Sequence, residues 1–205
     1  MEINERIIVA AESLFMKYGA RSVTMDDIAR ELSVSKKTIY QYYTDKDEIV
    51  TLVSQAHIDQ EKEDFNKIFE TSHNAIEEMF KMSQCMRKIV TEINPSLLFD
   101  LQKYHRKAWD LYLVYKTEFI KNSVVNNLSK GIEEGYYREE IDVEIIATYR
   151  VEQVQMAFDN KIFTRNKFNF LVVQMQLFDH FLHGLLTDKG RKLYKNYQQT
   201  NSDPK

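Results

Sequence analysis

Apolar residues recur at every third or fourth position along most of this chain, and that spacing predicts helices rather than strands. Five glycines and two prolines among 205 residues leave few positions for turns. We therefore expect an all-α fold. The longer segments with helical spacing are 3–18, 47–71, 73–91, 95–104, 105–134, 143–160 and 168–186.

Two shorter helices, separated by a three-residue turn, are predicted between the first and second long segments. Thr24 can cap the first of them, and Asp26 and Asp27 place negative charge at the positive end of its dipole. Ser35 can cap the second, which runs over 36–42. This arrangement predicts a helix-turn-helix, whose second helix enters the major groove of DNA.

The beginning of that second helix carries residue types that suit the edges of bases. Lysine donates to guanine, glutamine pairs with adenine, and threonine offers a hydroxyl and a methyl group. The alternative reading is an ordinary solvated helix start. We predict base contacts from Lys36, Lys37, Thr38 and Gln41.

Hydroxyl groups and a further cation flank this surface, and contacts to phosphates set the register of a protein on DNA. The next helix opens near Lys46, and its N-terminal amides with this ammonium can form an anion site. For the two tyrosines, the alternative is packing beneath the helix. We predict phosphate contacts from Ser35, Tyr40, Tyr42 and Lys46.

Three stretches, AAESLFMKYGARSVTMDDIA, SKKTIYQYY and DKDEIV, resemble the TetR family of bacterial transcriptional regulators. The resemblance covers roughly the first quarter of the chain closely and the rest only in helical layout. It implies that Thr24, Tyr40 and Lys46 contact phosphates, while 36–38 and Gln41 form the base-reading surface. It also implies an N-terminal three-helix helix-turn-helix domain, here 1–47, and a C-terminal helical ligand-binding and dimerisation domain, here 48–197. A polar tail at 198–205 follows.

Two positions depart from the family pattern. Ser33 stands where many members have a glycine in the turn, and Tyr43 stands where many have phenylalanine. A positive φ at Ser33 would carry modest strain that glycine avoids. The serine at position 33 therefore affects the expected shape of the turn, but not the identification of the helix-turn-helix.

The charge balance is unusual for a DNA-binding protein. The chain has a net charge of −3, and residues 1–50 hold seven Lys or Arg against nine Asp or Glu, which gives 7 − 9 = −2. Weak nonspecific binding to DNA follows from so little positive charge. We therefore expect two copies to act together on one site.

The segment 168–186 is apolar on two sides of a helix, and such a helix needs two packing partners. One stripe can pack within its own domain, and the other on a second copy beside the 143–160 helix; complete burial in one domain is the alternative. A two-fold homodimer presents its reading helices to half-sites about 34–36 Å apart, which implies a palindromic operator in double-stranded DNA. The predicted interface residues are Phe170, Val173, Leu177, His180, Phe181 and Leu185.

The middle of the chain is rich in methionine and aromatic residues, which either form plain core or wall a cavity. In the TetR family, the second domain commonly holds a small-molecule inducer that changes the separation of the reading heads. A mainly apolar ligand is therefore expected. The candidate pocket residues are Met82, Met86, Phe99, His105, Trp109, Tyr112, Gln153 and Met156.

Enzymatic and metal chemistry find little support. The motifs of P-loops, serine hydrolases and zinc proteases are absent from the sequence. His180 and His183 are three apart, but no cysteine or second histidine cluster accompanies them. The single cysteine, Cys85, fits a reducing compartment. We expect no enzyme, no cofactor, no bound metal, no signal peptide and no membrane span, and hence a cytoplasmic protein.

The sequence therefore predicts a homodimeric, ligand-responsive DNA-binding regulator, most often a repressor in this family. One alternative is a regulator without an inducer, controlled by a protein partner. The other is a helical interaction module whose helix-turn-helix is vestigial.

Overall fold

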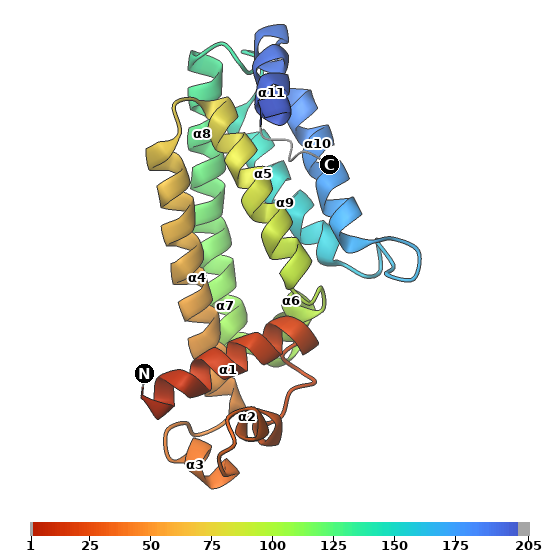
Figure 1. Cartoon of the computed structure of the whole chain (residues 1–205). Helices are drawn as coiled ribbons and strands as arrows, with labels where there is room; N and C mark the ends of the chain where they lie inside the picture. Colours follow the sequence, from red (N-terminus) through yellow and green to blue (C-terminus); the bar gives the residue numbers. More distant parts are fainter. Residues whose placement is uncertain (1, 201–205) are drawn as a thin grey trace. The chain divides into compact units, whose positions relative to one another are not determined.

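The computed structural model describes residues 2–200, and they form an all-helical structure, as predicted (Figure 1). A π-helical turn, Tyr115–Ile120, joins α7 to α8. The helices are α1 (Ile3–Tyr18), α2 (Met25–Glu31), α3 (Lys36–Tyr40), α4 (Lys46–Thr71), α5 (Ala75–Glu92), α6 (Leu97–Tyr104), α7 (Arg106–Val114), α8 (Lys121–Glu133), α9 (Val143–Phe158), α10 (Phe170–Leu185) and α11 (Asp188–Thr200).

The chain forms two compact units. The first contains Met1–Glu61 and Glu92–Tyr115, and the second contains Lys62–Thr91 and Lys116–Lys205. The first unit is thus larger than the predicted domain 1–47, because it includes the beginning of α4 together with α6 and α7. Of the predicted tail 198–205, the first three residues belong to α11, and 201–205 lie outside the described residues.

The first unit is built around a core shared by α1, α2, α3 and the beginning of α4, which gather together in Figure 1. Fully buried isoleucines supply its centre: Ile7, Ile28, Ile39 and Ile49. Because each of these four helices contributes one of them, the two short helices are held by packing, which compensates for their marginal intrinsic stability.

Local capping fixes where the two short helices begin. Thr24 Oγ1 accepts a hydrogen bond from the amide of Asp27 (3.2 Å), and the Asp27 carboxylate accepts one from the amide of Thr24 (2.9 Å). Ser35 Oγ accepts from the amide of Thr38 (3.0 Å). Between the helices, Ser33 adopts φ 56°, the left-handed conformation in which glycine would carry less strain.

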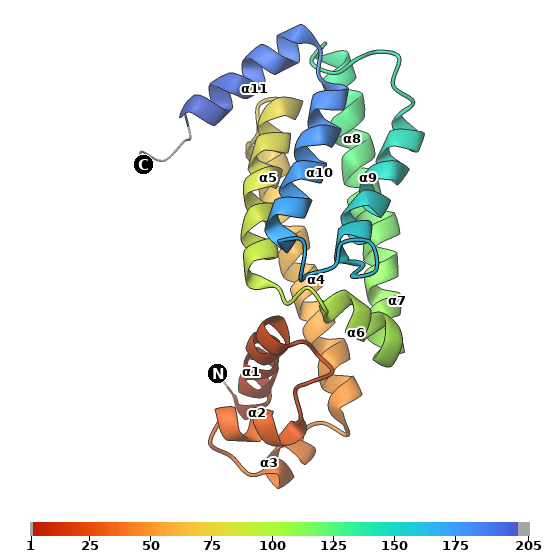
Figure 2. The ribbon, with the colours of Figure 1, turned by 90° about the vertical axis from the view of Figure 1, so that its right-hand side faces the viewer.

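The second unit has its own core, to which α5, α8, α9, α10 and α11 contribute. Figure 2 shows α5, α9 and α10 running alongside one another. Ile76, Leu128 and Leu182 are fully buried, as is Tyr137 in the loop after α8. The Tyr137 hydroxyl donates to Asn127 Oδ1 (3.0 Å), which fixes the ring within this core.

Two features of this architecture were not predicted. The 105–134 segment is two helices separated by the π-helical turn, because an extra residue at that point rotates one face relative to the other. Helix α11 was missed because it is mostly polar and buries only Gly190 and Tyr194 among its residues.

A brace between α1 and α4 stabilises the first unit. His57 Nδ1 lies 3.3 Å from a Glu12 carboxylate oxygen, and His57 Nε2 lies 3.5 Å from a carboxylate oxygen of Glu61. Hydrogen bonds to Glu12 and then Glu61 raise the pKa of His57 from 6.5 to about 10, against the opposing effect of burial. The imidazolium is therefore the form present at neutral pH.

We predict that replacing Gly131 with alanine destabilises the second unit. A Cβ at this position would lie 2.1 Å from the ring of Tyr137, which cannot move freely because its hydroxyl is bonded. Such overpacking lowers the free energy of unfolding by roughly 1–3 kcal/mol. Urea denaturation measures the change. The matched control is Gly184→Ala in α10, which has open space and should gain roughly 0.5–1 kcal/mol; equal effects of the two substitutions would refute the packing argument.

We predict a pH-dependent contribution from His57. Because its folded pKa is raised, the stabilisation is complete below the unfolded pKa of 6.5 and is lost as the pH rises toward about 10. For this partly exposed group, the contribution is on the order of 2 kcal/mol. The difference in unfolding free energy between the natural chain and His57→Gln should shrink from pH 7 to pH 10. A difference that stays constant over this range would show that the charge is unimportant.

Candidate nucleic-acid interface

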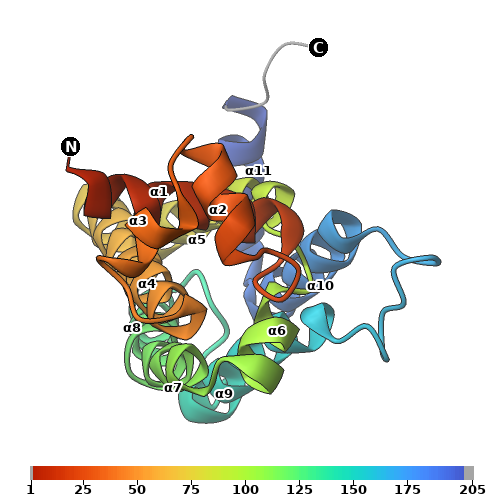
Figure 3. The same ribbon diagram turned by 90° about the horizontal axis from the view of Figure 1, so that it is seen from below.

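The beginning of α3 presents its polar residues to solvent. Lys36, Lys37 and Gln41 are exposed and Thr38 is half-buried, while Ile39 faces the core of the unit. Seen from below in Figure 3, α2 and α3 lie next to each other and nearest the viewer, beside α1. The four residues predicted to read bases therefore lie on one short helix and its C-cap, and Thr38 Oγ1 lies 2.8 Å from Ser35 Oγ.

Lys36 already has an anionic partner in the free protein. Its Nζ lies 2.9 Å from a carboxylate oxygen of Asp26 at the beginning of α2, and both side chains are exposed. A hydrogen bond to Asp26 raises the pKa of Lys36 above its ordinary value. The pair holds Lys36 across the two helices. Because exposed pairs are weak, Lys36 can exchange this partner for DNA at little cost.

The tyrosines near the end of α3 divide into two kinds. Tyr40 and Tyr42 are each 47 % exposed, so the alternative that they pack beneath the helix is not what the structure shows. Tyr43 is buried, and its hydroxyl donates to the carbonyl of Asn4 (3.0 Å). Tyr43 thus ties the reading helix to the beginning of α1, which a phenylalanine at this position could not do by hydrogen bonding.

Lys46 occupies a different place from the exposed lysines. Its Nζ donates to the carbonyls of Ala20 (2.9 Å) and Val23 (3.0 Å) and lies 3.4 Å from that of Arg21. Burial lowers the pKa of Lys46. The ammonium thus joins α4 to the α1–α2 loop. Phosphate contact by Lys46 stays a prediction, since in the free protein this group positions the helix-turn-helix.

Sequence reasoning missed a second connection to the end of α1. The Asn94 amide donates to the carbonyl of Met16 (2.6 Å), and Asn94 Nδ2 donates to that of Lys17 (3.1 Å). From α6, the Asp100 carboxylate accepts from the amide of Arg21 (3.0 Å). These bonds were missed because hydrogen bonds between residues far apart in the sequence leave no signal in a local pattern.

The predicted ligand-pocket residues divide between the two units. In the first unit, Trp109 is a core residue, with its ring 5.2 Å from that of Tyr112, and Phe99 is half-exposed. His105 is buried, and its Nδ1 lies 2.8 Å from Asp47 Oδ1. For these four residues the structure shows packing or exposure, which matches the plain-core alternative better than a cavity wall.

In the second unit, the predicted pocket residues are Met82, Met86, Gln153 and Met156, of which Gln153 is fully buried. Its Oε1 accepts from Arg150 Nη1 (2.9 Å), and its Nε2 donates to the hydroxyl of Tyr149 (2.9 Å). Arg150 is the residue that sequence reasoning overlooked. It is buried, although arginines on helices are ordinarily exposed.

The predicted dimer residues on α10 do not share one exposed face. Val173, Phe181 and Leu185 are buried in the core of their own unit, Phe170 and Leu177 are half-buried, and His180 is exposed. The first three therefore offer little surface to a second chain. The exposed apolar residues of this region are instead Ile145 and Tyr149 on α9 and Val172 on α10.

The described residues offer no alternative chemistry. Among residues 2–200, no group of three His, Cys, Asp or Glu side chains is arranged to hold a metal ion. His183 lies 3.5 Å from Asp179, a weak pair on α10. Within the same part of the chain, no helix combines the length and apolar character needed to cross a membrane.

Comparison with known proteins identifies the DNA-binding segment. Residues 7–53 match the family model for bacterial regulatory proteins of the tetR family. The chain is 26 % identical over 188 residues to YvaF, an HTH-type transcriptional regulator of Bacillus subtilis, covering 90 % of this chain and 97 % of that protein. It is 21 % identical over 151 residues to the transcriptional repressor KstR2 of Mycobacterium tuberculosis, covering 71 % and 76 %.

The fold agrees with this assignment. The structure of FadR from Bacillus subtilis in complex with stearoyl-CoA superposes with a TM-score of 0.62 at 16 % identity, covering 88 % of this chain and 98 % of that one. The family consists of DNA-binding regulators and not of enzymes, as predicted. The matched residues include the caps, the turn and the exposed beginning of α3 described above, and the chain belongs to the TetR family of transcriptional regulators.

Proposed function

We propose that this regulator is a homodimeric repressor that reads a palindromic operator with α3 and is released by a small, mainly apolar ligand. The observation that carries the proposal is the exposure of Lys36, Lys37 and Gln41 at one end of a helix whose other face is fixed by Ile39. A rigid helix with exposed polar side chains is what base reading in the major groove requires.

Phosphate contacts by Thr24, Ser35, Tyr40 and Tyr42 complete the proposed interface. Thr24 and Ser35 are helix caps whose oxygens accept amide protons. The Thr24 hydroxyl also donates to Asp27 Oδ2 (2.7 Å), and Ser35 Oγ lies 2.8 Å from Thr38 Oγ1, so a phosphate would take the place of these exposed side-chain partners. Tyr40 and Tyr42 are exposed, so their hydroxyls can reach a phosphate without repacking of the unit.

The exposed apolar residues of the second unit support a dimer. Ile145 is 64 % exposed and Val172 is 57 % exposed, and Tyr149 lies one turn after Ile145 on the same side of α9. Large exposed apolar residues on neighbouring helices mark candidate interaction surfaces. We propose that this face of α9 and α10, together with His180, replaces the buried residues as the core of the interface.

The proposed ligand response draws on the relatives. The FadR structure is a complex with stearoyl-CoA, and KstR2 is described as a transcriptional repressor. A ligand releases DNA when it favours a conformer whose two reading helices no longer fit the half-site spacing. A regulator controlled by a protein partner is the second candidate, and it is favoured by the plain-core packing of Trp109 and Tyr112.

Binding measurements on variants of α3 test DNA reading. Selection from a random duplex library should enrich a palindrome, and fluorescence anisotropy at fixed salt should show that Lys36→Ala with Lys37→Ala binds it at least tenfold more weakly, since each good base contact is worth about 1–3 kcal/mol. Asp26→Asn is the opposite test, because it removes the carboxylate that pairs with Lys36. This variant should bind any DNA more tightly than the natural chain. Recovery of no sequence, or equal binding by all three proteins, would favour the vestigial interaction module.

Substitutions on the exposed face of α9 and α10 test the dimer. Ile145→Glu with Val172→Glu should raise the dimer dissociation constant by a hundredfold or more, because burying an unpaired carboxylate costs several kcal/mol. Sedimentation equilibrium measures it. The matched control is Ile162→Glu, which changes a residue of similar exposure in the loop after α9 and should leave the dimer intact. If the double variant leaves the dimer intact, the interface lies elsewhere.

A further inference from the structure

The second unit contains a buried cation that lacks an anion. Arg150 on α9 is 7 % exposed, and among the residues that the structure describes no carboxylate lies within ion-pair distance of its guanidinium. The nearby acids have other partners: Glu152 bonds Lys116, and Glu144 bonds Lys121. A buried charge without a counter-ion is costly, so its presence needs an explanation.

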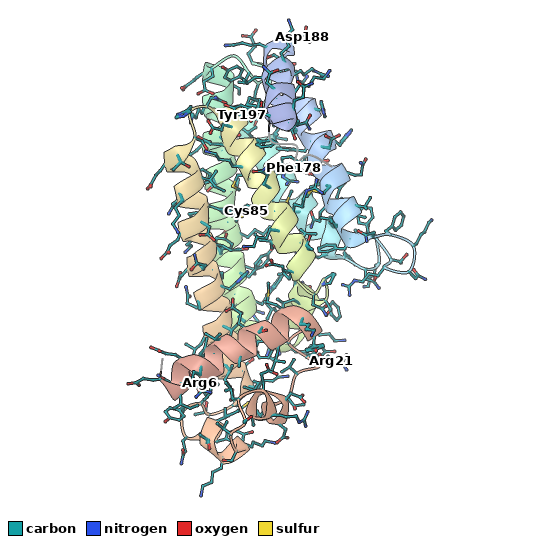
Figure 4. The ribbon with its side chains drawn as sticks, in the orientation of Figure 1. Arg6, Arg21, Cys85, Phe178, Asp188 and Tyr197 are labelled. Carbon is teal, nitrogen blue, oxygen red and sulfur yellow. The ribbon has the colours of Figure 1, made fainter. Side chains whose placement is uncertain are left out.

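The surroundings of the guanidinium hold it in place but do not neutralise it. Its carbon lies 5.2 Å from the centre of the Phe178 ring and 5.1 Å from that of Phe181, both on α10. Figure 4 shows Phe178 between α10 and α5. The two aromatic rings stabilise the cation through their faces. Nη1 donates to Gln153, and Nη2 donates to Met86 Sδ on α5 (3.4 Å), a weak acceptor.

The charge persists at physiological pH. Burial lowers the pKa of Arg150, but only to about 10. The group therefore stays protonated in the interior, with two of its five N–H donors bonded to an amide oxygen and a thioether. A guanidinium presents its donors as a planar fork that matches a carboxylate.

A second unpartnered polar atom lies on the same pair of helices. Gln174 on α10 is fully buried, its Nε2 donates to the carbonyl of Val154 (3.2 Å), and its Oε1 has no partner. Val154 follows Arg150 by one helical turn, and Gln174 precedes Phe178 by one turn. The α9–α10 contact thus contains an unneutralised cation and an unsatisfied acceptor within about one turn of each other.

Two neighbours of the cation reach the surface. Met86 is half-buried and has a flexible side chain, and Tyr149, whose hydroxyl is bonded to Gln153, is exposed. Displacing the Met86 sulfur would free a donor of Arg150 without breaking a strong hydrogen bond. The surrounding Phe178 and Phe181 rings suit an apolar body attached to the anion.

We propose that Arg150 anchors the effector of this regulator, and that the effector is an amphipathic carboxylate with a single anionic head and an apolar body. The proposal rests on the proposed ligand response and narrows it to a chemical class. The carboxylate replaces Met86 Sδ on the guanidinium, while the apolar body packs on Met86, Phe178 and Phe181. Binding supplies the missing counter-charge, and so it stabilises the ligand-bound arrangement of α5, α9 and α10.

The test compares matched ligands on the full-length protein without DNA. Isothermal titration calorimetry, below the micelle concentrations, measures dodecanoate, dodecanol and dodecyltrimethylammonium, which share an apolar chain and differ in the charge of the head. We expect dodecanoate to bind ~10–100-fold more tightly than dodecanol, as charge-assisted hydrogen bonds predict, and the cation to bind most weakly. Equal affinities for dodecanoate and dodecanol, or no binding of dodecanoate, would overturn the proposal.

Variants locate the effect. Arg150→Met preserves the apolar packing and removes the buried charge, so it should fold with an equal or higher Tm and lose the preference for dodecanoate. Arg150→Lys keeps the charge without the fork and should retain only part of that preference. The control is Arg87→Met, which removes an exposed cation from α5 and should change nothing. A preference that survives in Arg150→Met, or is lost in Arg87→Met, would refute the assignment.

Operator binding separates this proposal from the function on which it rests. If dodecanoate binds through Arg150 but leaves the operator complex intact, the anion site stands and the ligand-released repressor fails. If the operator is read normally but dodecanoate does not bind, the regulator stands and the anchoring role of Arg150 fails. Both results come from the same protein preparation, by calorimetry and by anisotropy.

Discussion

The end of α1 is the point on which the first unit depends. A helix leaves its last carbonyls without partners inside the helix, and here they are bonded from two other parts of the unit. Lys46 on α4 donates to carbonyls just beyond the helix, and Asn94, before α6, donates to those of Met16 and Lys17. The same groups that satisfy α1 therefore fix α4 and α6 relative to the helix-turn-helix.

This arrangement gives the reading helix a mechanical connection within its own unit. Tyr43 ties the residues after α3 to the beginning of α1, and Asp100 on α6 accepts from the amide of Arg21 after its end. Since these are direct hydrogen bonds to backbone, a displacement of α6 cannot leave α1 in place without breaking them. Loss of a buried hydrogen bond costs about 1–3 kcal/mol, which is within the range of allosteric coupling energies.

The sequence predicted best what short-range chemistry decides. Thr24 and Ser35 were identified as caps because a cap depends on residues three positions away, and the helix-turn-helix followed from them. The turn at Ser33 was marked by the resemblance, which places glycine there in many members, and the structure gives Ser33 a positive φ. By contrast, the bonds of Lys46 and Asn94 join residues 23 to 78 positions apart along the chain, and no periodic pattern records such a pairing.

Which side chains of α9 and α10 are buried in their own unit was the other feature that the sequence did not predict. Helix α10 is apolar on two sides, and both of its stripes were visible, but which stripe would face its own unit depends on where α5 and α9 pack. Phe181 and Leu185 were assigned to the dimer and are core. Arg150 was not singled out from the sequence, because its aromatic partners lie 28 and 31 positions later.

In each unit a lysine lies beside a carboxylate, Lys36 at the surface and Lys116 in the interior. Exposed cations such as Lys36 keep a weak anionic neighbour that DNA can replace, so that a protein of net charge −3 still presents lysines to a phosphate backbone. Buried Lys116 has the carboxylate of Glu152 at 2.6 Å. Arg150 differs from these lysines.

Two phenylalanine rings offset only part of the cost of burying Arg150. A cation–π contact is worth about 1–2 kcal/mol, whereas desolvation of an ion costs several kcal/mol. A helix pair that carries such a group is more stable with an anion than without one, and that difference is the free energy that a ligand needs in order to shift a conformational equilibrium.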